Sequence, residues 1–421
     1  MDDDECEVPD WVSPASKSAV RYGAPLASRR SSPEVKPPKS NGFGTWTGKL
    51  KNDIHPQGLL DEWRPVEHSE VIGVNKDEGR LTTWSWPPEE SGIRLVVESG
   101  LAPINGETSE DSPPLTVMRR VDDSVVVVCG VFDGLGGAGA SMISYKDPKR
   151  EEPYEFSQAY IASRLVRSVF EKSALDEDAC RRSVTSRYIK NCLSTMSARF
   201  SLAENSRVRG TMAKQLPTTI AAFRCDVPLG VAQPTECRVD ITWAGDSRVF
   251  IISPKFGLSV LTKDDVIPID ALEQLRTDPP MNNVVNNSVN FELRHEELKE
   301  IGPFILLAAT DGVFGYLPTP GFLEYLFLIC LNEPRTKPFA EVFLSRLMKY
   351  AADDISFTAV FVGFENALDG AKAEFSRRFR ELKERYKVLD RMSAAGEDLD
   401  SQIEHLWKIE APSYNRSVRS A

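Results

Sequence analysis

The stretch Val125–Phe132, with the sequence VVVVCGVF, is an apolar run that ends abruptly at Asp133-Gly134-Leu135-Gly136-Gly137. Its length and valine content are typical of a strand buried on both faces. An aspartate directly after such a strand lies at the margin of a sheet, and the glycines that follow let the backbone come close to a ligand. A plain Asp-Gly turn has the same sequence, so this stretch alone does not establish a functional site.

Similar apolar runs recur after residue 93, with helical patterns between them. Strands are expected at 93–97, 125–132, 219–223, 239–243, 249–252, 304–308 and 357–362, and helices at 157–172, 180–200, 321–331 and 338–350. Because strands and helices come in clusters rather than in strict alternation, the pattern favours an α+β fold with antiparallel sheets.

Carboxylates adjoin three more of the expected strands. Asp311 follows the run 304–310, Asp353 and Asp354 precede the run 355–362, and Glu110 and Asp111 precede the run 115–118. Carboxylates that gather in one place repel each other unless cations neutralise them. Oxygen ligands without nearby His or Cys suit Mg²⁺ or Mn²⁺. The four histidines, at 55, 68, 295 and 405, lie outside these acidic clusters, which argues against a His-ligated metal.

Six short motifs occur in an order that resembles the metal-dependent serine/threonine phosphatases of the protein phosphatase 2C type. They are GVFDGLGG at 130–137, PTT at 217–219, AGDSR at 244–248, LTKDD at 261–265, AATDGVF at 308–314 and DDIS at 353–356. In that family the corresponding motifs are GVFDGxGG, G(S/T)T, AGDSR, LTxDH, (A/S)SDG(L/V)(W/F) and D(N/D)xT. Each motif is weak alone, but the ordered set covers roughly residues 93–366.

The resemblance implies a sandwich of two packed antiparallel β-sheets flanked by helices (αββα), with two Mg²⁺ or Mn²⁺ ions at one edge. It implies that Asp133 bridges both ions and that the carbonyl of Gly134 contacts one of them. Glu110, Asp311 and Asp353 are then expected to hold the other ion.

The same resemblance implies roles beyond the ligands. Asp111 is expected to orient a water held by the metals, and the two ions activate a water that hydrolyses phosphoserine or phosphothreonine. Asp133, Asp311 and Asp353 are therefore the expected catalytic residues. Asp246 and Arg248 are expected to support the site rather than to bind metal.

Some positions depart from the best-known members of the family. Gly106 stands where those members have an arginine that grips the substrate phosphate, which leaves Arg94, Arg119 and Arg120 as substitutes. Leu135 stands where they often have a histidine proposed as the general acid. Residues 266–300 fall where the family has a variable flap beside the active site.

The chain divides by composition into four parts. Residues 1–42, rich in Ser, Pro and charge, are expected to be disordered, and 43–92, with four tryptophans, to be an extension that packs on the core or on a partner. Residues 93–366 form the expected catalytic domain, and 367–421 a helical tail. The tail carries an apolar seam at heptad spacing, Phe375, Phe379, Leu382, Tyr386 and Leu389. That seam fits docking on its own domain as well as a coiled coil with a partner.

Composition excludes several classes of protein. The net charge of −11 over 421 residues argues against nucleic-acid binding, which needs clustered Lys and Arg. No apolar stretch reaches the length of a membrane span, and the acidic start, Met1–Glu5, lacks the pattern of a signal peptide. Seven cysteines without CxxC spacing argue against a zinc site or a disulfide framework, so a cytoplasmic location is expected.

Two functions remain from these observations. The first is a signalling phosphatase that acts on phosphorylated proteins. The alternative is a catalytically impaired, phosphatase-like scaffold that binds a kinase or another protein through the N-terminal extension or the C-terminal helix. Retention of the clustered aspartates favours the first, and Gly106 and the long extensions favour the second.

Overall fold

The computed structural model describes residues 81–86, 95–104, 109–121, 123–145, 154–175, 184–199, 215–228, 236–277, 279–287, 289–334, 336–365, 368–395 and 397–416. The predictions for residues 1–42, and for 43–92 apart from 81–86, concern parts of the chain outside these ranges.

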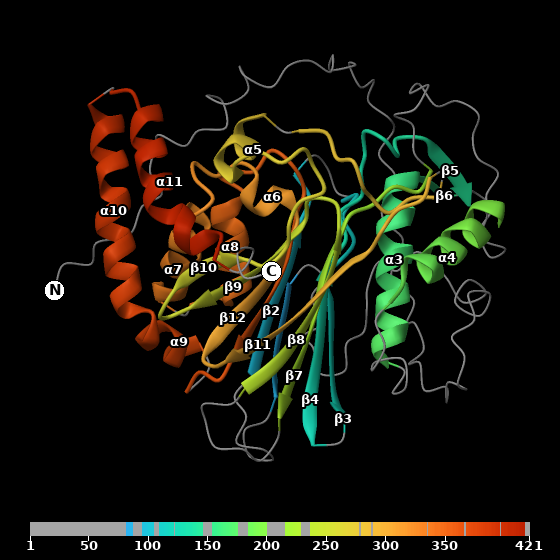
Figure 1. Ribbon diagram of the computed structural model, residues 1–421, viewed down its shortest axis with the longest axis horizontal. Coiled ribbons are helices and arrows are strands. Elements are labelled where there is room, and N and C mark those ends of the chain that lie inside the picture. Colours follow the sequence, from blue (N-terminus) through green and yellow to red (C-terminus); the bar gives the residue numbers. More distant parts are fainter. Residues whose placement is uncertain are drawn as a thin grey trace.

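Two antiparallel sheets form the centre of the molecule (Figure 1). The first sheet has the order β1 (Leu81–Trp86), β2 (Leu95–Ala102), β13 (Ile355–Val362), β12 (Phe304–Ala309), β9 (Arg248–Ser253) and β10 (Gly257–Val260). The second has the order β11 (Arg294–Ile301), β8 (Glu236–Ala244), β7 (Ile220–Pro228), β4 (Ser124–Val131) and β3 (Leu115–Val121). A separate hairpin joins β5 (Met142–Tyr145) to β6 (Tyr154–Ser157).

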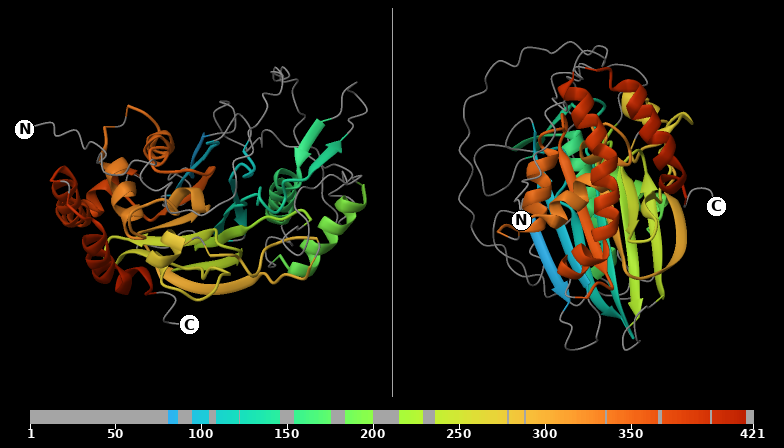
Figure 2. Two further views of the ribbon diagram at one scale, coloured as in Figure 1. Left: turned by 90° about the horizontal axis from the view of Figure 1, so that it is seen from above. Right: turned by 90° about the vertical axis from the view of Figure 1, so that its left-hand side faces the viewer.

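Helices cover the outer faces of both sheets, at opposite sides of Figure 1 and of the left view of Figure 2. On the second sheet lie α3 (Gln158–Leu175) and α4 (Ser186–Arg199). On the first sheet lie α7 (Phe322–Asn332), α8 (Phe339–Leu347) and α11 (Asp400–Tyr414), and α9 (Leu368–Glu374) and α10 (Ser376–Ala394) pack against α7. Two short helices, α5 (Ala271–Thr277) and α6 (Asp311–Phe314), lie at the upper ends of the strands in Figure 1. Among the described helices, none combines the length and hydropathy that a bilayer-spanning segment requires.

Three buried apolar clusters correspond to the spaces between these layers. One lies between the sheets, one under α3 and α4, and one under the remaining helices. Strand β12 shows why its sequence is continuously apolar: Leu306 belongs to the cluster between the sheets, whereas Ile305 and Leu307 belong to the cluster under the helices. All six residues of β12 are buried. The predicted fold class, α+β with two packed antiparallel sheets flanked by helices, is confirmed.

The flap expected at 266–300 is wrong for its last residues. Arg294–Ile301 forms β11, which pairs with β8 along its whole length. Charge dominates its sequence, RHEELKEI, because it is an edge strand whose side chains alternate between exposed and half-buried positions. Cross-strand ion pairs, Arg238–Glu297 at 2.8 Å and Lys299–Glu236 at 2.8 Å, accompany the pairing. Charged side chains are a common protection of sheet edges against further pairing.

The apolar seam of the tail is covered within the chain. Phe375, Leu382, Tyr386 and Leu389 are at most 1% exposed. The ring of Tyr386 lies 5.0 Å from that of Phe322 and 5.1 Å from that of Tyr325, both on α7. Of the two alternatives left by the heptad spacing, the structure shows docking on the chain's own domain.

Candidate active site

The acidic residues singled out in the sequence lie at one edge of the sandwich. Asp133 follows the end of β4, which is paired with the start of β3. Asp311 follows the end of β12, and Asp353 precedes β13, which pairs with β12. The antiparallel pairing therefore brings strand ends and strand starts to the same margin, as Figure 1 shows for the upper ends of the strands.

The carboxyl groups of Asp111 and Asp133 form the centre of this group. Asp111 is 2% exposed. Burial raises its pKa well above the ordinary value, and the charges of Asp354 and Asp353 raise it further. The pKa of Asp133 is also raised well above its ordinary value, by burial and then by the charges of Asp111, Asp311 and Asp353. Carboxylates so placed resist ionisation unless positive charge is supplied.

Asp246, which the sequence assigned to a supporting role, belongs to the same neighbourhood. Its charge is a further cause of the raised pKa of Asp133. The turn that carries it is held by a hydrogen bond of 2.6 Å between the hydroxyls of Ser247 and Thr219.

Glu110 and Asp111 point to different places although they are neighbours in sequence. The Oε1 atom of Glu110 accepts a hydrogen bond from the Ser157 hydroxyl at 2.7 Å. A Cβ added at Gly136 would collide with the Oε2 atom of Glu110. The carboxylate of Glu110 thus faces Ser157 and Gly136, and Asp111 is the member of the pair that acts most strongly on Asp133.

Backbone contacts fix Asp133 and Gly134. The carbonyl of Asp133 accepts hydrogen bonds from the Thr218 hydroxyl at 2.6 Å and from the Thr219 backbone N–H at 2.9 Å. At Gly134, an added Cβ would lie 2.5 Å from the carbonyl oxygen of Glu110 and 2.8 Å from that of Ala159. Glycine is therefore required here by the close approach of three chain segments.

Two residues that the sequence did not assign hold the segment of Glu110 and Asp111. Asp354 accepts hydrogen bonds from Ile104 N–H at 2.9 Å, the Ser109 hydroxyl at 2.8 Å and Glu110 N–H at 3.0 Å. Buried Arg164, from α3, donates to the carbonyl oxygens of Ser109 at 3.1 Å and Glu110 at 3.3 Å. Asp354 was visible in the DDIS motif but had no role, and nothing in the sequence around Arg164 distinguished it.

The arginines considered as phosphate ligands lie elsewhere or outside the described residues. Leu115 pairs with Gly130 at the site end of β3, whereas Val121 pairs with Ser124 at the opposite end. Arg119 and Arg120 lie near that opposite end, so they are wrong as substitutes. Arg94 and Gly106 fall outside the described residues.

The donor chemistry of the site fits a hard divalent cation. Within the part of the chain that the structure describes, no three His, Cys, Asp or Glu side chains converge closely enough to hold a metal ion. The Oδ2 atom of Asp111 is nevertheless buried and accepts no hydrogen bond from a described residue. Clustered carboxylate oxygens, one of them buried without a partner, are the groups that Mg²⁺ and Mn²⁺ neutralise.

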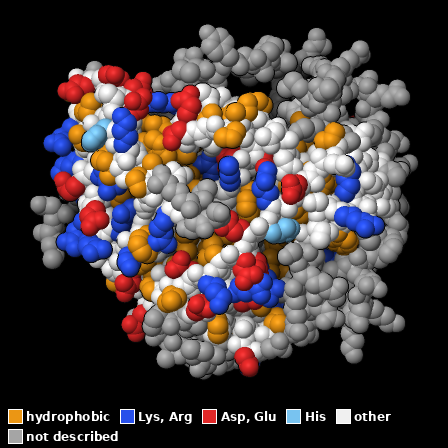
Figure 3. All heavy atoms as spheres, viewed as in Figure 1, with side chains coloured by type: hydrophobic (Ala, Val, Ile, Leu, Met, Phe, Trp, Pro, Cys, Tyr) orange, Lys and Arg blue, Asp and Glu red, His pale blue; other side chains and the backbone are white. Residues whose placement is uncertain are grey.

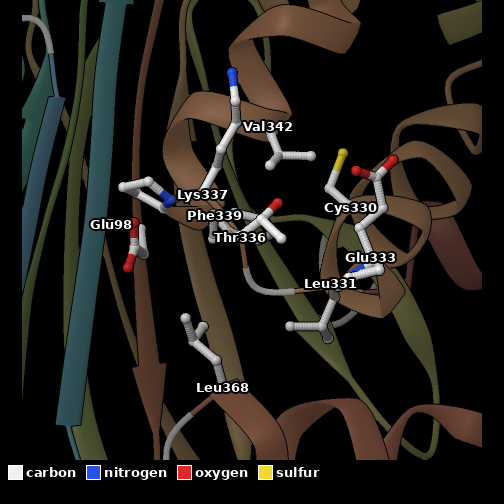
Figure 4. A pocket seen from close by; sticks show the side chains of 11 residues that line it. Glu98, Cys330, Leu331, Glu333, Thr336, Lys337, Phe339, Val342 and Leu368 are labelled. Atoms are coloured by element: carbon white, nitrogen blue, oxygen red, sulfur yellow. The ribbon is translucent and has the colours of Figure 1, made fainter.

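A cavity of about 400 Å³ lies apart from these residues, where the α7–α8 corner meets β2 (Figure 4). Its walls are mainly apolar, with Leu331, Phe339 and Leu368 among them. The carboxylate of Glu98 in its wall accepts a hydrogen bond from Ala340 N–H at the start of α8, at 3.2 Å. None of the acidic residues of the candidate site lines this cavity.

Solved structures with a similar fold include phosphatases. RsbX, crystallised with magnesium, is 14% identical with a TM-score of 0.37, and the match covers 67% of this chain and 100% of RsbX. The catalytic domain of the serine/threonine protein phosphatase PstP, with two manganese ions, is 15% identical with a TM-score of 0.37, covering 64% and 98%. A C. elegans sex-determining protein is 14% identical with a TM-score of 0.42, covering 66% and 67%.

No protein-family model matches the sequence, and no curated protein matches it either. Identities this low concern the fold, and the activity has to be argued from the residues of the site.

Proposed function

We propose that this protein is a metal-dependent protein phosphatase that hydrolyses phosphoserine and phosphothreonine on other proteins. The observation that carries the proposal is the gathering of Asp111, Asp133, Asp311 and Asp353 from separate segments at one sheet margin, where the buried Oδ2 atom of Asp111 has no hydrogen-bond partner among the described residues. A single buried carboxylate has many structural explanations, but several aspartates gathered around a buried one call for a compensating cation.

The proposal assigns metal-binding roles to the acidic residues of the site. Asp111, Asp133, Asp311 and Asp353 would hold two ions, with the carbonyl of Gly134 completing the donor set. When bound, Mg²⁺ or Mn²⁺ supplies an activated water and neutralises the oxygens of the phosphoryl group.

Preorganisation is the contribution that the fold itself makes. Thr218 and Thr219 hold the backbone of Asp133, and Asp354 and Arg164 hold the segment before Asp111. Because these contacts exist before substrate arrives, the carboxylates need little rearrangement during the reaction.

The test is Mn²⁺-dependent hydrolysis of p-nitrophenyl phosphate and of a phosphothreonine peptide. Asp133→Asn should lower kcat/KM by roughly 100-fold or more, because even changes around a metal ligand cost 10- to 100-fold. Asp240→Asn is the matched control, since Asp240 lies on β8 in a partly exposed ion pair with Arg238. Activity that survives Asp133→Asn, or that does not require a divalent cation, would rule out the proposed mechanism.

One observation favours the alternative function, a phosphatase-like scaffold for a kinase or another protein. Three carboxylates do not converge on a common point among the described residues. Calorimetric titration with Mn²⁺ separates the two functions: a scaffold without a metal site shows neither binding heat nor turnover. An Asp311→Asn variant used as bait for phosphoproteins would then identify substrates of the active enzyme.

A reducing cytoplasm is the compartment that fits this proposal. Cys129, Cys192, Cys225, Cys237 and Cys330 are buried thiols rather than disulfides. Thiols of this kind are usual in cytosolic proteins.

A further inference from the structure

Arg248, from the AGDSR motif, is a buried cation at which four other segments of the chain meet. Its Nε and Nη2 atoms donate to the carboxylate of Asp264 at 2.9 and 2.7 Å, and Nη2 also donates to Gln274 Oε1 on α5 at 2.7 Å. Its Nη1 atom donates to the hydroxyl of Tyr414, the last residue of α11, at 2.9 Å. The guanidinium carbon lies 4.3 Å from the ring centre of Phe314.

One of these four segments, α6, and the segment of Arg248 itself belong to the acidic site. Phe314 is the last residue of α6, and Asp311 is the first. Asp246 lies two residues before Arg248, and its charge acts on both Arg248 and Asp133. The guanidinium is thus connected to Asp246 through the backbone and to Asp311 through α6.

The C-terminal helix α11 is also docked by contacts that do not involve Arg248. Trp407 Nε1 donates to Asp270 Oδ1 at 2.7 Å. The Ser259 hydroxyl of β10 donates to the carbonyl of Ser413 at 2.7 Å. Loss of the Tyr414 hydroxyl alone would thus leave the helix in place, and its effect would have to act through Arg248.

We propose that Tyr414 is a positioning residue for the acidic site, so that the C-terminal helix α11 is part of the catalytic unit. Without the hydroxyl, an N–H of the buried Arg248 guanidinium would lose its partner, and the group would turn or admit water. Either change moves Asp246 relative to Asp133. The inference rests on the proposed function, because the groups that Tyr414 positions are the ones proposed to hold the metal.

The test compares Tyr414→Phe with Tyr386→Phe in the full chain. Both variants keep the ring and lose one buried hydroxyl: that of Tyr386 donates to Glu410 at 2.7 Å and lies 2.8 Å from the Thr319 hydroxyl. Both should lower the melting temperature by similar amounts. Mn²⁺ affinity, measured by calorimetry, should fall on the order of tenfold in Tyr414→Phe and remain at the wild-type value in Tyr386→Phe. With p-nitrophenyl phosphate at saturating Mn²⁺, kcat should fall in Tyr414→Phe while KM stays unchanged.

Each outcome decides the matter. Equal Mn²⁺ affinities in Tyr414→Phe and Tyr386→Phe overturn the positioning role, even if the wild type is an active phosphatase. A wild type that binds Mn²⁺ without turnover overturns the proposed function, and tenfold weaker binding by Tyr414→Phe would still support the positioning role. A wild type that binds no Mn²⁺ overturns both.

Discussion

Replacing Asp354 by alanine would release both ends of the connection between β2 and β3. One oxygen of Asp354 accepts a hydrogen bond from Ile104 N–H, and the other accepts from the Ser109 hydroxyl and Glu110 N–H. The carboxylate therefore joins the start of β13 to Ile104, which follows β2, and to Ser109 and Glu110, which precede β3. Asp111, next in the chain, depends on this anchor for its position beside Asp133.

The magnitude follows from two opposing effects. Three hydrogen bonds to a partly buried carboxylate contribute about 1 kcal/mol each, or about 3 kcal/mol in total. Against this, Asp354 is the leading charged neighbour that raises the pKa of Asp111. Relief of that repulsion offsets part of this loss. The hydrogen bonds win, and Asp354→Ala should lower the free energy of unfolding by about 2 kcal/mol.

Asparagine at position 354 separates the two effects. Its single amide oxygen can keep the hydrogen bonds from Ser109 and Glu110 and lose the one from Ile104, while the charge disappears. The lost hydrogen bond and the relieved repulsion act in opposite directions, so Asp354→Asn should destabilise the protein clearly less than Asp354→Ala.

Urea unfolding in the presence of a chelator measures these changes without a contribution from metal. Asp398→Ala serves as a control, because exposed Asp398 makes a local hydrogen bond with Asp400 N–H at 3.0 Å and should change the free energy of unfolding by less than about 0.5 kcal/mol. If Asp354→Ala is no more destabilising than Asp398→Ala, or if alanine and asparagine at position 354 behave alike, the anchoring argument is wrong.

Three further perturbations have defined outcomes. Gly312→Ala should destabilise the protein by more than about 1 kcal/mol, because its Cβ would collide with the Asp354 carbonyl, whereas Gly137→Ala, which meets no atom within 4 Å, should be nearly neutral in the same urea assay. Glu410→Gln should flatten the pH dependence of the melting temperature. Burial raises the pKa of Glu410 in the folded protein. The stability of the wild type therefore falls as the pH rises from about 4.3, the pKa of an unfolded-state glutamate, through the higher pKa of the folded state. Mn²⁺ should raise the melting temperature of the wild type but not of Asp133→Asn, and without Mn²⁺ that variant should melt above the wild type because repulsion is relieved.

The central strands could be predicted because burial on both faces restricts their sequences to apolar and small residues. Every residue of β12 and β13 is buried, so these strands have to be continuously apolar or small. Edge strands have no such requirement. The exposed face of β11 admits charge, and the charged sequence RHEELKEI carries no strand signal that a sequence argument could use.

The sequence could predict only those site residues that lie next to the ends of buried strands. Asp133, Asp311 and Asp353 adjoin buried strands, so the antiparallel pairing brings them to one margin. Which of Glu110 and Asp111 points inward depends on local backbone direction, which Ser157 and Gly136 help to set. Such contacts join residues far apart in the chain, and no local pattern reports them.

The C-terminal helices show how polar contacts decide what an apolar period leaves open. A heptad seam packs equally well on its own domain and on a partner, but buried polar groups need specific donors and acceptors. Glu410 on α11 accepts hydrogen bonds from Tyr386 on α10 and from Thr319 in the loop before α7.

Similarly, Arg378 on α10 donates to the buried carboxylate of Glu324 on α7 at 2.6 and 2.8 Å. Transfer of the helices to another protein would leave Glu324 and Glu410 buried without these partners, which is strongly unfavourable. A protein that recognises the tail would therefore have to bind its outer surface, where basic and acidic side chains are interspersed on the left of Figure 3. Binding there would be sensitive to salt, and it would leave Tyr414 on Arg248.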